Sequence, residues 1–111
     1  MKTDYSNAPN SELNREVAKR QGWQLNEQMV NEDSFGQRPN SSKIEFIPRP
    51  ADDANDAISL LAGEYYQIEH FEDNKFRVKL DYDQAPEGVA NTLPRAMTIA
   101  WLQWGDFKAN D

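Results

Sequence analysis

The 111-residue sequence contains no cysteine. It therefore cannot form a disulfide, a thiolate nucleophile, an iron–sulfur cluster or a zinc site with cysteine ligands. Histidine is nearly as scarce, because His70 is the only one, and a metal site or catalytic triad needs partners that one histidine without cysteine hardly supplies. We interpret His70 as a structural residue and expect no metal and no cofactor, although carboxylates alone could bind Mg²⁺ or Ca²⁺.

Long apolar runs and familiar catalytic motifs are also missing. No stretch approaches the roughly 18 residues of a membrane-spanning helix, and the polar start MKTDYSNAPN does not resemble a signal peptide. No glycine-rich phosphate loop or nucleophile elbow occurs, and DANDA at residues 53–57 lacks the glycine and the final glutamate of an EF-hand loop. We expect a soluble cytoplasmic protein without a membrane partner.

Basic residues are scarce in the second half of the chain. Residues 51–111 hold twelve acidic and five basic side chains, whereas residues 1–50 hold seven of each, so the second half carries the whole net charge of −7. Nucleic-acid affinity depends on cationic contacts, so we expect no direct nucleic-acid binding. A simpler interpretation of the acidic residues is a well-solvated surface.

The segment from Glu64 to Tyr82 predicts a β-hairpin. Aromatic and β-branched residues flank Glu72-Asp73-Asn74, and Asp and Asn tolerate the geometry of a hairpin turn. A three-residue loop with Asn74 in the left-handed conformation gives one nearly apolar face and one charged face. The apolar face then pairs His70 with Phe76, Ile68 with Val78, Tyr66 with Leu80 and Glu64 with Tyr82. The charged face pairs Phe71 with Lys75, Glu69 with Arg77, Gln67 with Lys79 and Tyr65 with Asp81.

The remaining pattern predicts helices at about residues 11–21, 52–62 and 92–104. Asn10 or Ser11 should cap the first helix and Asp52 or Asp53 the second, and glycines should end all three. Short strands are indicated near residues 23–29, 44–47 and 89–90. We read residues 1–10 as a polar lead, 31–43 as a polar loop and 106–111 as a polar tail, with a single domain at 11–105.

These elements predict an α+β fold, a small layered sandwich with a mainly antiparallel sheet whose central hairpin is packed by helices. In the last helix, apolar residues recur at helical spacing at Leu93, Met97, Ala100, Trp101 and Trp104. A two-stranded hairpin needs a cover for its apolar face. We expect this helix to cover Tyr66, Ile68, Val78 and Leu80.

Four segments resemble the phage ABA-sandwich domain family, small proteins of tailed phages and prophages. They are ELNREVAKRQGW at 12–23, PADDANDAISLL at 50–61, EHFEDNKFRVKL at 69–80 and GVANTLPRAMTIAWLQ at 88–103. The resemblance implies a sheet layered between helices, and it brings no established reaction and no catalytic residues.

The leading functional hypothesis is a non-enzymatic, phage-type accessory protein that binds a host or phage protein, for example as an inhibitor of a host factor or defence system. Exposed aromatic and acidic side chains are the candidate contacts. They are Tyr65, Phe71, Trp104, Asp52, Asp53, Asp56, Asp81 and Asp83. A sharper version is that the acids mimic nucleic-acid phosphates and occupy the basic groove of a DNA- or RNA-handling protein.

Two alternatives stay open from the sequence. A small metabolite or nucleotide could bind between helix and sheet through Arg77, Lys79 or Arg95. A Mg²⁺-dependent hydrolase could use converging Asp residues, although helix capping and solvation explain the same acids. The oligomeric state is left open.

Overall fold

The structure is a computed structural model that describes residues 5–30 and 33–109. Along the chain its elements are α1 (Asn10–Arg20), β1 (Gln24–Val30), β2 (Asp33–Gln37), β3 (Ile44–Phe46), α2 (Ala54–Leu60), β4 (Tyr66–Phe71), β5 (Lys75–Leu80), β6 (Glu87–Ala90) and α3 (Leu93–Ala109). The three predicted helices all occur, and the α+β class is confirmed.

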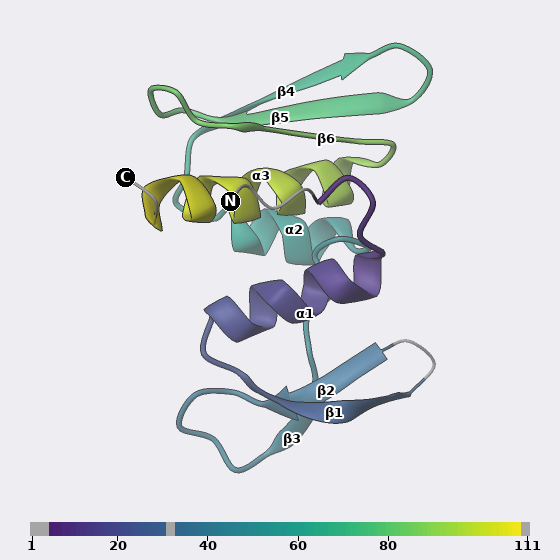
Figure 1. Cartoon of the computed structure of the whole chain (residues 1–111), viewed down its shortest axis with the longest axis vertical. Helices are drawn as coiled ribbons and strands as arrows, with labels where there is room; N and C mark the ends of the chain where they lie inside the picture. Colours follow the sequence, from purple (N-terminus) through teal and green to yellow (C-terminus); the bar gives the residue numbers. More distant parts are fainter. Residues whose placement is uncertain (1–4, 31–32, 110–111) are drawn as a thin grey trace.

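The strands form two antiparallel sheets with the helices between them. We call β1-β2-β3 the N-terminal sheet and β4-β5-β6 the C-terminal sheet, each in that strand order. Figure 1 shows the sheets at opposite ends of the molecule, with α1 next to the N-terminal sheet and α3 next to the C-terminal sheet. Helix α2 packs against α3. This layer order is the reverse of the sheet between helices that the family resemblance implies.

The register of the β4–β5 hairpin is confirmed. Tyr66 lies opposite Leu80, Ile68 opposite Val78, and Glu69 opposite Arg77. Asn74 adopts the left-handed conformation with a φ of 61°, which closes the three-residue loop. The pattern of side chains along the two strands was therefore sufficient to fix their pairing.

The predicted cover of the hairpin is wrong for one of its four residues. Val78 and Leu80 are fully buried and Tyr66 is partly buried in the cluster that α3 covers, but Ile68 keeps 47% of its surface exposed. The reason is β6, which pairs with the other side of β5 and makes β5 the central strand. Helix α3 lies against β5 and β6, so β4 extends past it.

Gly88 explains why α3 lies so close to β6. A Cβ atom at this position would lie 2.2 Å from the carbonyl oxygen of Ala96 and 2.4 Å from the amide nitrogen of Ala100. No side chain fits into that space. The strand and the helix backbone are therefore in direct contact through this glycine.

The predicted polar loop at 31–43 is wrong in part, because β2 occupies residues 33–37. The buried positions of this strand are Ser34 and Gly36, which carry no apolar side chain. The usual alternation of apolar and polar residues is therefore absent from the sequence. The part of the prediction at residues 31–32 lies outside the described residues.

The predicted polar ends are also wrong where the structure describes them. Tyr5 is only 5% exposed, and its hydroxyl donates to the Asp106 carboxylate. The last helix continues past Gly105 to Ala109, because Arg20 holds its final turns by donating to the Leu102 carbonyl at 2.9 Å and to Asp106 at 2.6 Å. Residues 1–4 and 110–111 lie outside the described residues.

The predicted helix caps are right for one helix and wrong for the other. Asp53 caps α2 by accepting from the amides of Asn55 and Asp56. Pro9 takes the cap position of α1, with no side-chain cap from Asn10 or Ser11. The side chain of Asn10 instead contacts other segments of the chain.

Candidate functional site

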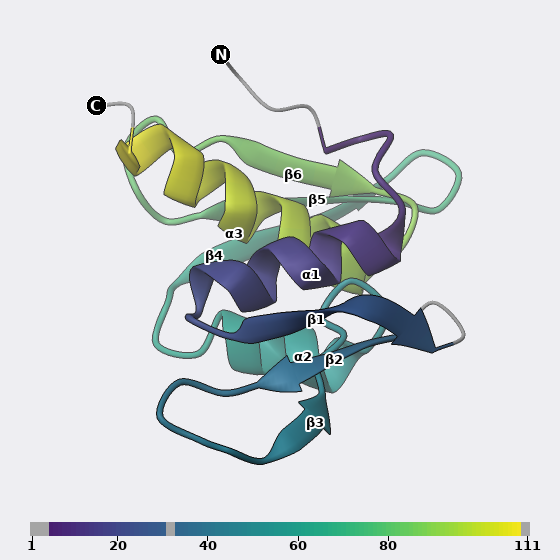
Figure 2. The ribbon, with the colours of Figure 1, turned by 60° about the horizontal axis from the view of Figure 1, so that its bottom comes forward.

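Strand β4 is the most exposed part of the C-terminal sheet. It is an edge strand, and its four middle residues, 67–70, are exposed on both faces. Tyr65, directly before it, is 82% exposed. Helix α3 packs against β5 and β6, and Figure 2 shows it beside β6. Within the described residues no helix packs on β4 in the same way.

The outward face of the C-terminal sheet carries a charged ladder. Arg77 lies between two carboxylates, with its Nη1 atom 3.5 Å from Glu69 and its Nε atom 3.1 Å from Glu87. Its guanidinium also stacks over the Phe71 ring at 4.5 Å. The Nε atom is buried and donates no hydrogen bond to the described residues, so its contact with Glu87 is ionic only. The predicted outward orientation of Glu69 and Arg77 is confirmed.

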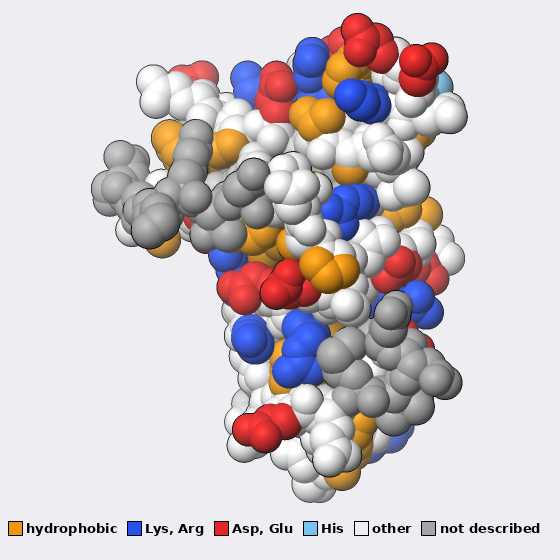
Figure 3. Space-filling view, turned by 45° about the vertical axis from the view of Figure 1, so that its right-hand side comes forward, with side chains coloured by type: hydrophobic (Ala, Val, Ile, Leu, Met, Phe, Trp, Pro, Cys, Tyr) orange, Lys and Arg blue, Asp and Glu red, His pale blue; other side chains and the backbone are white. Residues whose placement is uncertain are grey.

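Charged side chains of both signs lie around the hairpin. Figure 3 shows acidic and basic side chains interspersed at the top of the molecule. The loop itself contributes Glu72 and Asp73. His70 is exposed and stacks on Phe76 with ring centroids 4.7 Å apart, so it takes part in cross-strand packing.

The three candidate aromatic residues do not form one patch. Tyr65 and Phe71 lie at opposite ends of β4. Trp104 lies on α3, where it stacks on Tyr82 at 4.5 Å and on Phe107 at 5.7 Å. Only Tyr65 is strongly exposed among the three.

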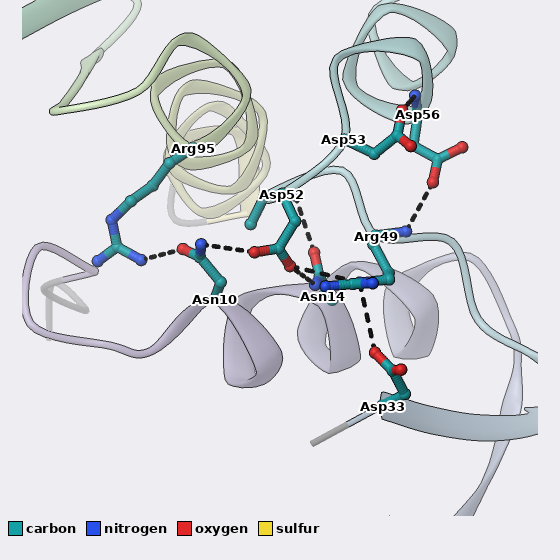
Figure 4. Close-up of polar contacts among 9 residues, drawn as sticks. Asn10, Asn14, Asp33, Arg49, Asp52, Asp53, Asp56 and Arg95 are labelled. Atoms are coloured by element: carbon teal, nitrogen blue, oxygen red, sulfur yellow. Dashed lines mark hydrogen bonds and ion pairs between the residues drawn. The ribbon is translucent and has the colours of Figure 1, made fainter. Parts of the chain in front are cut away.

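Three of the candidate acids accept hydrogen bonds around the start of α2, and one of them, Asp52, connects this segment to α1. Asp52 accepts from Asn10 at 2.8 Å and from Asn14 at 2.9 Å. Asp53 caps α2, and Asp56 accepts from the backbone amide of Arg49 at 2.9 Å. Figure 4 shows these carboxylates directed toward amides and Arg49 and away from a common centre. They do not form a paired-carboxylate site.

The same connection continues to β2 and α3. The Arg49 side chain lies 3.3 Å from Asp33 and 3.6 Å from Asp52, and Arg95 donates to Asn10 at 2.6 Å (Figure 4). An open polar cleft of about 630 Å³ adjoins it. No sequence pattern predicts Asn10 and Asn14 as a polar link, because Asn is also common in loops and at helix ends.

The other candidate acids and bases are dispersed. Asp81 and Asp83 are exposed in the connection after β5. Arg77 and Lys79 lie on the outward face of β5, whereas Arg95 on α3 donates to the carbonyls of Tyr5 and Ser6. The described residues contain no group of three or more acids or histidines positioned to hold a metal ion. The structure does not bring Arg77, Lys79 and Arg95 together around one ligand site.

A second network that the sequence did not reveal joins the two ends of the described chain. Arg20 donates to the Tyr5 hydroxyl at 2.9 Å and lies 2.6 Å from Asp106. Burial and the hydrogen bond to Asp106 raise the pKa of Tyr5, and the positive charge of Arg20 opposes them. A separate cleft of about 410 Å³ between residues 5–8 and α1 adjoins this network.

A scan against protein-family models found no match for this chain, and searches of curated proteins and of solved structures found no significant one. No helix in the described part of the chain is long and apolar enough to cross a membrane.

Proposed function

We propose that this chain is a non-enzymatic binding protein, a phage-type accessory protein that binds a host or phage protein in the cytoplasm of the host cell. The observation that carries the proposal is the exposure of β4. Tyr65, directly before β4, and Ile68 on β4 expose apolar surface on the two opposite faces of this edge strand, and no helix of the described residues packs on it. Exposed apolar side chains beside an uncovered strand edge are available for contact with another protein.

The roles of the acidic residues support binding over catalysis. Asp52 accepts a hydrogen bond from α1, Asp53 caps α2, and Asp56 accepts from the backbone amide of Arg49, so all three have structural roles. A hydrolase mechanism needs carboxylates that face a common substrate position. Because these three acids have structural roles, we propose that the exposed acids near the hairpin loop form the charged part of the binding surface.

The phage origin and the inhibitory role are proposed on the resemblance of the four sequence segments alone. We assign mimicry of nucleic-acid phosphates to exposed acids of the second half of the chain, among them Asp81, Asp83, Glu72 and Asp73. Binding through such charges weakens as salt is raised, because exposed charges are screened. Binding that is unchanged between low and high salt contradicts the mimicry and leaves the contact through β4 in place.

The test uses affinity capture from a lysate of the bacterial host, with partners identified by mass spectrometry. We expect the wild-type chain to retain a partner that Ile68→Lys does not retain. The matched control is Ile58→Lys on α2, because Ile58 is also an exposed isoleucine at 55% exposure. Retention of the same partner by Ile68→Lys, or the absence of any partner specific to the wild-type and control proteins, contradicts the proposal.

A further inference from the structure

The geometry of β4 points to the form of its partner, and this inference rests on the proposed function. We propose that β4 receives an extended segment of the partner as an added antiparallel or parallel strand. We further propose that this segment alternates apolar residues with polar ones and carries Lys or Arg at its ends. The partner is thus recognised by backbone hydrogen bonds along the strand and by charge at its ends.

The backbone of β4 offers free hydrogen-bonding groups on one side. The amide of Asp81 donates to the carbonyl of Tyr65 at 2.8 Å, which makes this pair a hydrogen-bonded one. Such pairs alternate along an antiparallel ladder, so the residues that bond to β5 are 67, 69 and 71. The amides and carbonyls of Tyr66, Ile68 and His70 therefore point away from β5, toward the open edge.

The other three sheet edges carry features that hinder strand addition. Strand β3 has only three residues and is followed closely by Pro48. Strand β6 has four residues and directly follows Pro86, and β1 has a shift of register between Leu25 and Met29. Short length, proline and irregular pairing are the usual means by which proteins protect exposed edges. Strand β4 has six residues in continuous register and contains no proline or lysine.

The acids at the two ends of β4 favour a basic partner over a second copy of this chain. Residues 64–74 contain Glu64, Glu69, Glu72 and Asp73 and no Lys or Arg. Glu69 is paired with Arg77 of β5, so Glu64 at one end and the loop acids at the other are the charges that this argument uses. Antiparallel pairing of two β4 strands would bring this acidic segment against itself, which is unfavourable. An incoming strand with a cation at each end meets Glu64 at one end of β4 and the acidic loop at the other.

The alternation of side chains along β4 indicates which residue types suit the middle of the partner segment. Tyr66, Ile68 and His70 share the face that turns toward the helix layer, beside the buried Val78 and Leu80 of β5. Alternate residues of an added strand lie next to them and are best apolar. The residues between these lie beside Gln67, Glu69 and Phe71 on the outward face, where polar side chains fit.

The first experiment uses synthetic peptides of about seven residues, long enough to span β4. One peptide alternates Thr with Val or Ile and carries Lys at both ends, and its matched control carries Glu in place of Lys. We expect the Lys-ended peptide to bind at least about tenfold more tightly at low salt. In amide exchange measured by NMR, it should slow exchange at Tyr66, Ile68 and His70, whereas the amides of Gln67, Glu69 and Phe71 should already be protected without peptide.

The second experiment removes one of the outward donors. Ile68→Pro deletes an amide that does not take part in the β4–β5 ladder, and Ile68→Thr keeps the amide with a β-branched side chain. We expect Ile68→Pro to bind the Lys-ended peptide about tenfold more weakly than Ile68→Thr, the effect of one lost hydrogen bond with an unsatisfied partner. If Ile68→Pro fails to fold, the amide exchange of Tyr66, Ile68 and His70 in the wild-type protein, measured with and without the Lys-ended peptide, decides whether β4 receives an added strand.

The outcomes separate this inference from the proposed function. Equal binding of the two peptides, binding without protection of the three alternate amides, or no binding at about 1 mM peptide overturns strand addition by a basic segment. If capture from lysate still depends on Ile68, the proposed function stands without it. A dimer in sedimentation that disappears in Ile68→Pro also overturns the inference, because β4 then pairs with a second copy.

Discussion

The two sheets have the same size and the same antiparallel order, but they attach to the helix layer in different ways. The C-terminal sheet packs on α2 and α3 through an apolar cluster that contains Val78, Leu80 and Met97. The N-terminal sheet meets α1 through a smaller cluster around Trp23 and through hydrogen bonds of the Arg15 side chain to Ser34 at 2.8 Å and Asn26 at 3.3 Å. Burial of apolar side chains therefore holds the C-terminal sheet on the helices, whereas polar contacts contribute much more to the attachment of the N-terminal sheet.

The comparison also shows that exposed apolar side chains do not by themselves make an open sheet edge. Ile44 and Phe46 on β3 are 64% and 61% exposed, at least as much as Ile68 on β4. Strand β3 is nevertheless too short to offer a row of free backbone groups. The difference between the two edges lies in strand length and continuous register, and it is the reason why we propose the binding role for β4 and not for β3.

The largest expected effect separates the two attachments directly. Leu80→Ala should lower the free energy of unfolding by about 2–5 kcal/mol, because Leu80 is fully buried between the sheet and the helices. Leu25→Ala in the half-buried part of the N-terminal sheet is the matched control and should lower it by clearly less. Urea denaturation followed by circular dichroism measures both. Equal losses would mean that the two sheets depend on burial to the same degree.

The same contrast explains which parts of the fold the sequence predicted. The β4–β5 hairpin and the helices follow from patterns of apolar and polar residues, so their existence, register and class could be read in advance. Strand β2 could not, because its buried positions are Ser34 and Gly36. The exposure of Ile68 could not be predicted either, because it depends on the pairing of β6 with β5, which is a long-range feature of the tertiary structure.

For similar reasons, the positions of the candidate site residues could be predicted only in part. Tyr65 and Phe71 were identified because the hairpin register placed them on the outward face, and the structure gives them that register. The roles of Asp52, Asn10 and Arg95 depend on contacts between residues that are separated in the sequence by 38 to 85 positions. A local sequence pattern does not determine such contacts.

A smaller effect is expected from the polar attachment of the N-terminal sheet. Arg15→Met keeps most of the side-chain stem but removes the hydrogen bonds to Ser34 and Asn26, so it should lower the free energy of unfolding by about 1 kcal/mol. Amide exchange should accelerate in β1 and β2 and stay unchanged in β5. Lys19→Met on the exposed part of the same helix is the control. Faster exchange in β5 to the same extent would contradict separate attachment of the two sheets.

The smallest effect concerns the network in which Tyr5 and Arg20 join α1 to the end of α3. The pKa of Tyr5 is raised by burial and by its hydrogen bond to Asp106, so the folded state holds this proton more firmly than the unfolded chain does. The stability from this contact is present below the unfolded pKa of about 10 and is lost as the pH rises through the higher folded value. Tyr5→Phe should therefore flatten the fall in stability above about pH 10.

The control for this measurement is Tyr82→Phe. The pKa of Tyr82 is also raised, chiefly by its hydrogen bond to Glu64, but Tyr82 lies at the C-terminal sheet and does not link α1 to α3. Both variants should reduce the alkaline loss of stability, and only Tyr5→Phe should speed amide exchange in α1 and the last turns of α3 at neutral pH. If Tyr82→Phe speeds amide exchange in α1 to the same extent, the Tyr5 hydroxyl is not the group that joins α1, which holds the N-terminal sheet, to α3, which covers the C-terminal sheet.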